Sequence, residues 1–229
     1  MYGLPDGYVS RLNPQYFDDI LPDSSSWQSD VYKVAYQLAQ LVGVTRLIDV
    51  GCGRGEKLLP YADDFEIVGI DYGANIDYCH ANNHPGTWVT ADLNAEILNA
   101  DYFENAVVVC ADVIEHLPQL DALLESLQNA YETAPFVLLS TPDRARVYNG
   151  REHMGPPGNP YHCREWKLDE LIGLLTSKGL PVRWAGWTIS NDTRPDQVWT
   201  SLVVMSKHHN IQIQNTRYEA ATKWLPVIE

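Results

Sequence analysis

The stretch LIDVGCGRGEKL, residues 47–58, combines an acidic side chain with three alternating glycines. Asp49 ends an apolar run, and Gly51, Gly53 and Gly55 follow it. Glycine lets the backbone turn tightly, so that a ligand can lie against bare peptide groups. A helix that begins behind such a turn presents unpaired N–H groups and the positive end of its dipole. These residues therefore predict a ligand-binding turn between a strand and a charged helix start.

The charge of this turn narrows the class of ligand. A dinucleotide site has the spacing G-x-G-x-x-G, which would place a third glycine at position 56. This chain has Glu56 there, and Asp49 lies two residues before the first glycine. Both acidic groups fit poorly with an anionic pyrophosphate. The pattern favours a ligand that carries an ammonium and a carboxylate group and no phosphate.

Further acidic residues close the apolar runs that follow. Asp71 ends the second run, 20 residues after Gly51, where its carboxylate can accept hydrogen bonds from both hydroxyls of a ribose. Asp92 follows the third run in TADLN and can accept a bond from an adenine amino group; capping a helix is its alternative role. The fourth run ends in CADVIEHL, where capping a turn is the alternative role of Asp112.

This order of motifs, across residues 30–206, resembles the class I S-adenosylmethionine-dependent methyltransferases and, among them, the small-molecule O-methyltransferases. The resemblance implies S-adenosylmethionine as the cofactor and S-adenosylhomocysteine as its product. It also implies an α/β fold with a Rossmann-like, doubly wound sheet of seven mostly parallel strands, including a C-terminal antiparallel hairpin strand. A nicotinamide-dependent enzyme is the alternative that the glycine spacing disfavours.

The cofactor residues that the resemblance implies lie at or just after the ends of apolar runs: Asp49, Gly51, Cys52, Gly53, Gly55, Asp71, Tyr72, Asp92, Leu93, Ala111 and Asp112. The glycine turn and Asp49 would hold the methionine part. The end of the second run would hold the ribose, with Tyr72 beside the adenine. Asp92 and Leu93 would frame the adenine, and the end of the fourth run would line the approach to the sulfonium.

Methyl transfer requires positioning of the acceptor and removal of its proton. Histidine is the natural base for a hydroxyl, and we expect His116 or His162 to act as the catalytic base. A structural role for His116 and a helix-capping role for His162 are the alternatives. His162 belongs to the stretch 142–164, which follows the fifth run and lacks helical or alternating periodicity. Long loops of this kind are usually functional, so we expect it to form the acceptor pocket.

Arginines in this stretch give it a local basic excess. Arg144 and Arg151, with His153, are the predicted substrate-binding residues, which suits an anionic acceptor such as a nucleotide-linked sugar. Surface salt bridges are the alternative role for the arginines, and a solvated loop position is the alternative for His153.

A metal site is the less favoured interpretation of the residues that end the fourth apolar run. Asp112, Glu115 and His116 have the spacing at which some relatives bind a divalent cation through E-x-x-E-H. Oxygen ligands suit Mg²⁺ or Mn²⁺, and imidazole suits Mn²⁺ or Zn²⁺. The first position here is Asp, which is one methylene shorter than Glu, so the prediction is a site without a metal.

The elements that must position these residues follow from apolar periodicity. Five buried strands are predicted at residues 46–50, 66–71, 87–91, 106–112 and 135–141. Helices are predicted from Ser29, as N-cap, to Gly43, from Pro118 to about residue 131, and over 165–178. Alternation of strands and helices predicts a parallel sheet. The runs 182–190 and 198–206 have no helix between them and should form a hairpin.

The remaining segments complete the predicted organisation. Residues 1–28 read as an arm whose Tyr16, Phe17 and Trp27 close over the cofactor, residues 29–206 as the methyltransferase domain, and residues 207–229 as an extension packed on it. A net charge of −14 disfavours nucleic acid and anionic membranes as partners. No apolar segment approaches the length of a membrane span or a signal sequence, which predicts a soluble, cytoplasmic protein.

The predicted function is transfer of a methyl group from S-adenosylmethionine to a hydroxyl of a small metabolite, with a saccharide or a natural product as candidate acceptors. N- or C-methylation is one alternative. A non-catalytic S-adenosylmethionine-binding domain within a larger assembly is the other. The sequence does not identify the acceptor or the oligomeric state.

Overall fold

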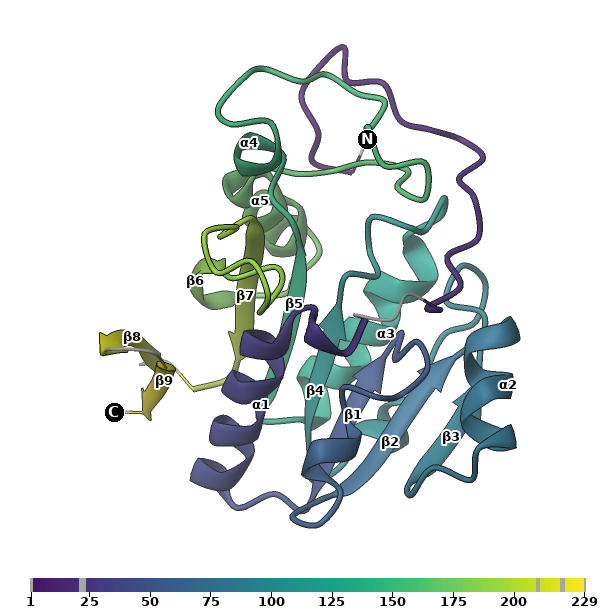
Figure 1. Ribbon diagram of the computed structural model, residues 1–229, viewed down its shortest axis with the longest axis vertical. Helices are drawn as coiled ribbons and strands as arrows, with labels where there is room; N and C mark the ends of the chain where they lie inside the picture. Colours follow the sequence, from purple (N-terminus) through teal and green to yellow (C-terminus); the bar gives the residue numbers. More distant parts are fainter. Residues whose placement is uncertain (1, 21–23, 209–210, 219–220, 229) are drawn as a thin grey trace.

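The chain folds around one seven-stranded sheet, described here from a computed structural model that covers residues 2–20, 24–208, 211–218 and 221–228. The strand order is β3-β2-β1-β4-β5-β7-β6 (Figure 1). The strands are β1 (Arg46–Val50), β2 (Glu66–Asp71), β3 (Thr87–Thr90), β4 (Ala106–Ala111), β5 (Phe136–Pro142), β6 (Val182–Thr188) and β7 (Thr200–Ser206). Strands β1 to β5 pair in parallel, and β7 runs antiparallel between β5 and β6. The predicted fold class and hairpin are confirmed.

Alternating side chains build one apolar layer on each face of this sheet. In β1, Leu47 joins the layer beneath helix α1 (Ser29–Val42), whereas Ile48 joins the layer beneath α3 (Asp121–Thr133) and α5 (Leu168–Ser177). Helix α2 (Gly73–Ala81) contributes Ile76 to the α1 side. Because both faces are covered, every residue of β4 is buried, as parallel sheets require.

Several helix boundaries differ from the predicted ones. The helix expected behind the glycine turn is only a 3₁₀ turn, η2 (Leu59–Tyr61), because Pro60 lacks an N–H group and restricts the residue before it. Ser29 is the first residue of α1 rather than its N-cap, which is Gln28. Helix α3 begins three residues after Pro118, and α5 begins three residues after Glu165.

The long connection after β5 contains a short helix that its sequence does not indicate. Helix α4 (Arg144–Val147) begins at Asp143, whose side chain accepts hydrogen bonds from the N–H groups of Ala145 and Arg146. The connection then turns back over the carboxyl ends of the strands, where Figure 1 shows it next to the N-terminal arm. Backbone bonds join the two segments, from Val9 N to Met154 O (2.7 Å) and from Arg11 N to Cys163 O (2.7 Å).

A second sheet, absent from the sequence-based prediction, follows β7. Strands β8 (Ile211–Tyr218) and β9 (Ala221–Ile228) pair as an antiparallel hairpin, and β9 contacts α1. Two further 3₁₀ turns, η1 (Ser24–Ser26) and η3 (Ala100–Phe103), precede α1 and β4. Among the described residues, no helix has the length and apolar composition needed to cross a membrane.

Candidate active site

A cavity of about 540 Å³ lies at the carboxyl edge of the sheet. Its walls come from the arm, the glycine turn, the ends of β2, β4 and β5, and residues 159–162 of the long connection. The predicted site residues that line it are Gly51, Gly53, Asp71, Tyr72, Leu93, Ala111, Asp112, His116 and His162. The topology therefore brings the motifs of four separate strands to one cavity.

The glycine turn can form only because its residues lack side chains. Gly51 has φ +85°, and a Cβ atom there would lie 2.2 Å from Cγ2 of Val113. The N–H groups of Gly51 and Cys52 both donate to the carbonyl of Ile70 (2.7 and 3.1 Å). These bonds anchor the turn to β2 and expose its backbone to the cavity.

Asp71 is the buried carboxylate at the end of β2. Its Oδ2 accepts a hydrogen bond from Gly53 N (2.7 Å), and its Oδ1 accepts one from Tyr72 N (2.7 Å). Burial raises its pKa to about 6, although both backbone bonds favour the ionised form. Each oxygen keeps a second lone pair, so the carboxylate can still accept hydrogen bonds from the two hydroxyls of a ribose.

Asp49 lies behind the turn and does not line the cavity. Its Oδ2 accepts a hydrogen bond from the hydroxyl of Tyr32 (2.7 Å), and burial raises its pKa to about 7. Cys52 and Gly55 also lie outside the lining; Gly55 approaches the ring of Trp88 so closely that a Cβ atom would overlap it. These three residues shape the turn from its protein side.

Of the three residues predicted to lie around the adenine, Tyr72 and Leu93 line the cavity. Tyr72 lines it and packs edge to face against Tyr16 of the arm, with ring centroids 5.4 Å apart. Leu93 is buried in the wall. Asp92 is outside the lining, and its Oδ1 accepts a hydrogen bond from Asn94 N (3.0 Å). Asp92 thus caps a local turn and no helix follows it, so the helix-capping alternative is not formed, and the adenine contact stays a prediction.

Asp112 lines the cavity in a left-handed backbone conformation, with φ +54°. Its Oδ2 accepts a hydrogen bond from Nε2 of Gln28 (2.6 Å), and its Oδ1 is buried without a hydrogen-bond partner among the described residues. Burial raises its pKa. The side chain is thus held in the wall by the residue that precedes α1.

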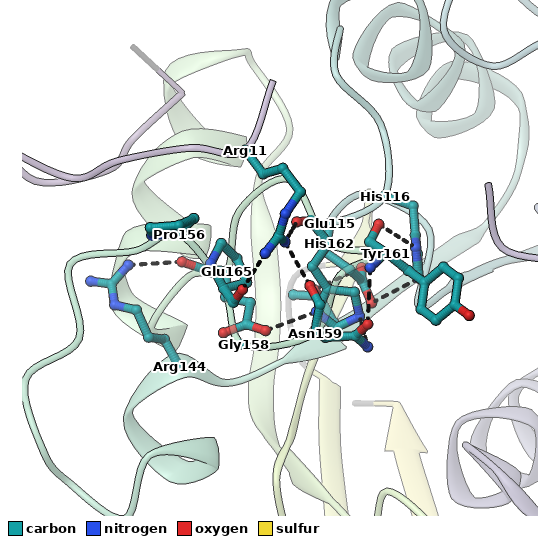
Figure 2. A network of polar contacts seen from close by, with 12 residues as sticks. Arg11, Glu115, His116, Arg144, Pro156, Gly158, Asn159, Tyr161, His162 and Glu165 are labelled. Atoms are coloured by element: carbon teal, nitrogen blue, oxygen red, sulfur yellow. Dashed lines mark hydrogen bonds and ion pairs between the residues drawn. The ribbon is translucent and has the colours of Figure 1, made fainter. Parts of the chain in front are cut away.

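The tautomers of both predicted bases follow from their hydrogen-bond partners (Figure 2). His116 Nδ1 lies 3.0 Å from the carbonyl of Tyr161, which can only accept, so Nδ1 carries the proton. Burial lowers the pKa of His116 to about 3, which keeps the ring neutral. Its Nε2 therefore carries a lone pair.

The same reasoning fixes the tautomer of His162. Asn159 Oδ1 accepts a bond from Tyr161 N (3.0 Å), so the amide nitrogen of Asn159 is the atom 2.9 Å from His162 Nε2. Nε2 must accept, and Nδ1–H then donates to Oε1 of Glu165 (2.8 Å). Arg11 of the arm holds this loop by donating to the carbonyls of Asn159 and His162 (both 2.6 Å).

Glu115 adds a buried carboxylate beside the two rings. Its Oε2 accepts a hydrogen bond from the hydroxyl of Thr141 (2.8 Å), whereas its Oε1 has no hydrogen-bond partner in the described part of the chain and lies 3.9 Å from His116 Nε2. Ligand atoms of Glu115, His116 and His162 all lie within 4.8 Å of one another. An unpaired carboxylate oxygen and two imidazoles fit a divalent cation. His162 stands in this group where the residue spacing indicated Asp112.

The predicted substrate-binding residues Arg144, Arg151 and His153 lie outside the cavity lining. The guanidinium of Arg144 is buried and donates to the carbonyl of Glu165 (2.8 Å) and to Glu170 (2.6 Å). The ring of His153 stacks on Tyr148 with centroids 3.9 Å apart. Arg144 therefore holds the connection against α5, His153 packs within the connection, and Arg151 is exposed.

The family follows from comparison with known proteins. Residues 17–211 match the family described as "Methyltransferase domain". The chain belongs to this family.

Relatives of this methyltransferase domain agree on the cofactor. It is 28% identical over 155 residues to a probable S-adenosylmethionine-dependent methyltransferase of Mycobacterium tuberculosis, covering 65% of this chain and 53% of that protein. It is 25% identical over 146 residues to the ubiquinone biosynthesis O-methyltransferase of Rickettsia felis, covering 61% of this chain and 54% of that protein. The chain spans about half the length of these curated relatives.

A solved structure confirms the fold of the domain. The CcbJ methyltransferase from Streptomyces caelestis superposes with a TM-score of 0.60 at 16% identity, covering 82% of this chain and 94% of the other. The predicted family, fold class and S-adenosylmethionine dependence are therefore confirmed at the level of the domain. The predicted O-methyltransferase branch and acceptor stay proposals.

Sequence reasoning missed several residues that line the cavity of this methyltransferase domain. Asp19, Lys57 and Asn75 carry polar side chains into the lining, and Tyr161 supplies an aromatic wall. Each belongs to a segment whose place depends on tertiary structure: the arm, the residues after the glycine turn, α2 and the long connection. Lys57 lies in the predicted ligand-binding turn and Tyr161 in the predicted acceptor loop, although neither was singled out; around Asp19 and Asn75 the sequence pattern carries no sign of a ligand contact.

Proposed function

We propose that this domain transfers the methyl group of S-adenosylmethionine to a hydroxyl of a small metabolite. The observation that carries the proposal is the pair of histidines, His116 and His162, which lie together at one wall of the cavity; Nε2 of His116 carries a free lone pair, whereas Nε2 of His162 accepts a hydrogen bond from Asn159. S-adenosylmethionine supplies a methyl group already activated by its positive sulfur. The remaining task of the protein is to hold the acceptor in line and take its proton.

The histidines are built to accept that proton. His162 Nδ1–H donates to Glu165, so a positive charge on the ring after proton uptake would face a carboxylate. His116 lacks such a partner on Nδ1, which donates to a carbonyl, and burial already disfavours its charged form. We therefore favour His162 as the base, which requires the acceptor hydroxyl to replace the amide of Asn159 at its Nε2, with His116 as the residue that orients the hydroxyl through its own Nε2.

The cavity walls favour an apolar or aromatic acceptor over an anionic one. Leu12, Phe17, Leu117 and Tyr161 line the histidine end of the cavity, and no arginine lies in its lining among the described residues. Phe17 packs against both His116 and Tyr161, with ring centroids 5.3 and 5.5 Å away. Of the two acceptor classes considered from the sequence, a natural-product hydroxyl fits these walls better than a charged saccharide.

The direct test incubates the protein with methyl-labelled S-adenosylmethionine and a metabolite extract, and identifies the labelled product by mass spectrometry. We expect an O-methyl product on an apolar or aromatic hydroxyl. An N- or C-methyl product would assign the chain to the alternative chemistry. Absence of any labelled product, with S-adenosylmethionine bound, would favour the non-catalytic domain.

Single variants then identify the base. His162→Ala should lower turnover by roughly 10²–10⁴-fold while the affinity for S-adenosylhomocysteine is unchanged. His153→Ala is the matched control because that ring lies outside the cavity lining, and it should retain full turnover. Near-normal turnover of His162→Ala would show that positioning alone drives the reaction.

A metal-assisted reaction is the second candidate, because Glu115, His116 and His162 come together with an unpaired carboxylate oxygen. These three residues would hold the cation, and it would lower the pKa of an acceptor hydroxyl. Activity that a chelator removes and Mn²⁺ restores would favour this candidate. Activity that chelators leave unchanged would favour the histidine base.

A further inference from the structure

One carboxylate of the arm reaches into the cavity beside the glycine turn. Asp19 is only 7% exposed and lines the cavity. Its Oδ2 lies 2.5 Å from the point where a Cβ atom on Gly53 would stand. A side chain at position 53 would therefore collide with this carboxylate, and only glycine leaves room for it.

The backbone around Asp19 is fixed by a single amide of α2. Asn75 Oδ1 accepts a hydrogen bond from Asp19 N (2.9 Å), and Asn75 Nδ2 donates to the carbonyl of Phe17 (3.2 Å). Tyr16, which precedes Phe17 in the arm, donates its hydroxyl to the carbonyl of Tyr72 (3.0 Å). These bonds aim the Asp19 side chain at the turn.

Asp19 raises the local negative charge at a place that already holds two carboxylates. Its charge contributes to the raised pKa of Asp49 and of Asp71, so all three lie around the same turn. Oδ1 of Asp49 is buried without a hydrogen-bond partner among the described residues. Arg54 is engaged by Asp18, 3.0 Å away, and Lys57, which lines the cavity, is the protein cation whose charge lowers the pKa of Asp49. Three carboxylates against this one cation favour a positive ligand group at this point.

We propose that Asp19 binds the α-ammonium group of the methionine part of S-adenosylmethionine. The inference rests on the cofactor that the family uses. That cofactor has two positive groups. The sulfonium must face the acceptor at the end of β4, and the ribose belongs to Asp71, so the ammonium is the group left for the carboxylate beside Gly53. An ammonium–carboxylate hydrogen bond is charge-assisted, and it would make cofactor binding depend on the arm.

Titration calorimetry with two ligands tests this assignment. S-adenosylhomocysteine carries the ammonium group, whereas 5′-methylthioadenosine keeps the adenosine and the thioether but lacks the amino-acid part. In Asp19→Asn, which keeps the size of the side chain, the dissociation constant of S-adenosylhomocysteine should rise by about 10- to 100-fold, the range for a charge-assisted bond. Binding of 5′-methylthioadenosine should be unchanged.

Asp18→Asn is the matched control, because it removes a carboxylate from the adjacent residue that pairs with Arg54 outside the cavity. It should leave both affinities unchanged. Equal losses for the two ligands in Asp19→Asn would overturn the proposal in favour of a ribose contact, and unchanged affinity for both would overturn it outright. The measurement needs no acceptor, so a failure of the proposed hydroxyl methylation would leave it unaffected.

Discussion

The charge states of the cavity are set by how each titratable side chain is buried and bonded. Asp71 has a pKa of about 6 because burial raises it more than two backbone N–H donors lower it. His116 has a pKa of about 3 because burial and the neighbouring His162 both disfavour its charged form. Near neutral pH the cavity therefore presents an ionised acceptor for a ribose and an uncharged imidazole for a hydroxyl.

The first prediction is that cofactor affinity rises with pH. Only the ionised form of Asp71 can accept two ribose hydroxyls through lone pairs, so below a pKa of about 6 the ligand must displace a proton. The affinity for S-adenosylhomocysteine should increase by up to about tenfold per pH unit until the pH exceeds this pKa, and then level off. Calorimetry across this range measures the effect. Asp71→Asn should bind more weakly and lose the dependence; a parent protein with constant affinity would contradict the ribose role.

The second prediction separates backbone strain from steric overlap at two glycines. Gly51 and Gly43 have similar positive φ values, +85° and +70°, but a Cβ atom would overlap Val113 only at position 51. Gly43→Ala should cost about 1–2 kcal/mol of unfolding free energy through strain alone. Gly51→Ala should cost about 1–3 kcal/mol more through overpacking, and it should abolish cofactor binding. Equal costs by urea denaturation would contradict the overlap.

At the residue scale, the sequence predicted cavity-lining side chains at the strand ends, in the arm and in the long connection, among them Asp71, Tyr16 and His162, but missed Asp19 and Asn75. Asp71 and Asp112 were accessible to prediction because parallel strands end at one edge of a sheet. Asp19 depends on an arm folded back across that edge, which no local pattern records. Arg144 shows the opposite failure, since its basic charge suggested a ligand contact and its bonds to Glu165 and Glu170 give it a structural role.

The elements that close the cavity are the arm and the long connection, and they hold each other. Arg11 of the arm donates to three carbonyls of the connection, including Pro157 (2.8 Å), and Arg11 N donates to Cys163 O. The connection in turn places His162. The closure of the arm over the cofactor that its apolar side chains predict would therefore be coupled, through the long connection, to the position of His162.

The third prediction is that the ligand protects the arm from proteolysis. S-adenosylhomocysteine should slow trypsin cleavage after Arg11, because a ligand held by the arm stabilises its closed state. Lys207, an exposed residue directly after β7, is an internal control whose cleavage rate should not change. Rates are followed by mass spectrometry of the fragments. Equal slowing at both sites would indicate global stabilisation, and no slowing at Arg11 would contradict closure of the arm.

At the element scale, apolar runs predicted all seven strands of the main sheet; β1, β4 and β5 are nearly continuous in apolar residues because they are buried parallel strands. The ends of the helices were predicted less accurately from the sequence. Pro60 shortens the segment behind the glycine turn to a 3₁₀ turn, and α4 exists because Asp143 caps a segment without helical periodicity. The β8–β9 hairpin was missed because its strands lie beside α1 and outside the main sheet.

The whole protein has a net charge of −14, and three arginines in and beside the long connection make contacts within the protein. Arg144 is buried against Glu170, the guanidinium of Arg146 lies over the ring of Trp187 (4.0 Å), and Arg164 donates to the carbonyl of Pro118 (2.8 Å). Three of the four arginines of the local basic excess are therefore engaged in contacts within the protein, and the fourth, Arg151, is exposed.

The fourth prediction follows from this distribution of charge. Binding to nucleic acid draws most of its free energy from cations that neutralise phosphates, and a chain of this net charge repels the phosphate backbone instead. Fluorescence anisotropy with a labelled single-stranded RNA should show no binding up to about 100 µM protein at about 0.15 M salt, the weak end of nonspecific affinity. Lowering the salt should not reveal binding, because weaker screening strengthens the repulsion. S-adenosylhomocysteine titrated into the same preparation confirms that the protein is folded. A micromolar affinity that strengthens at low salt would show a basic surface and would reopen RNA as the methyl acceptor.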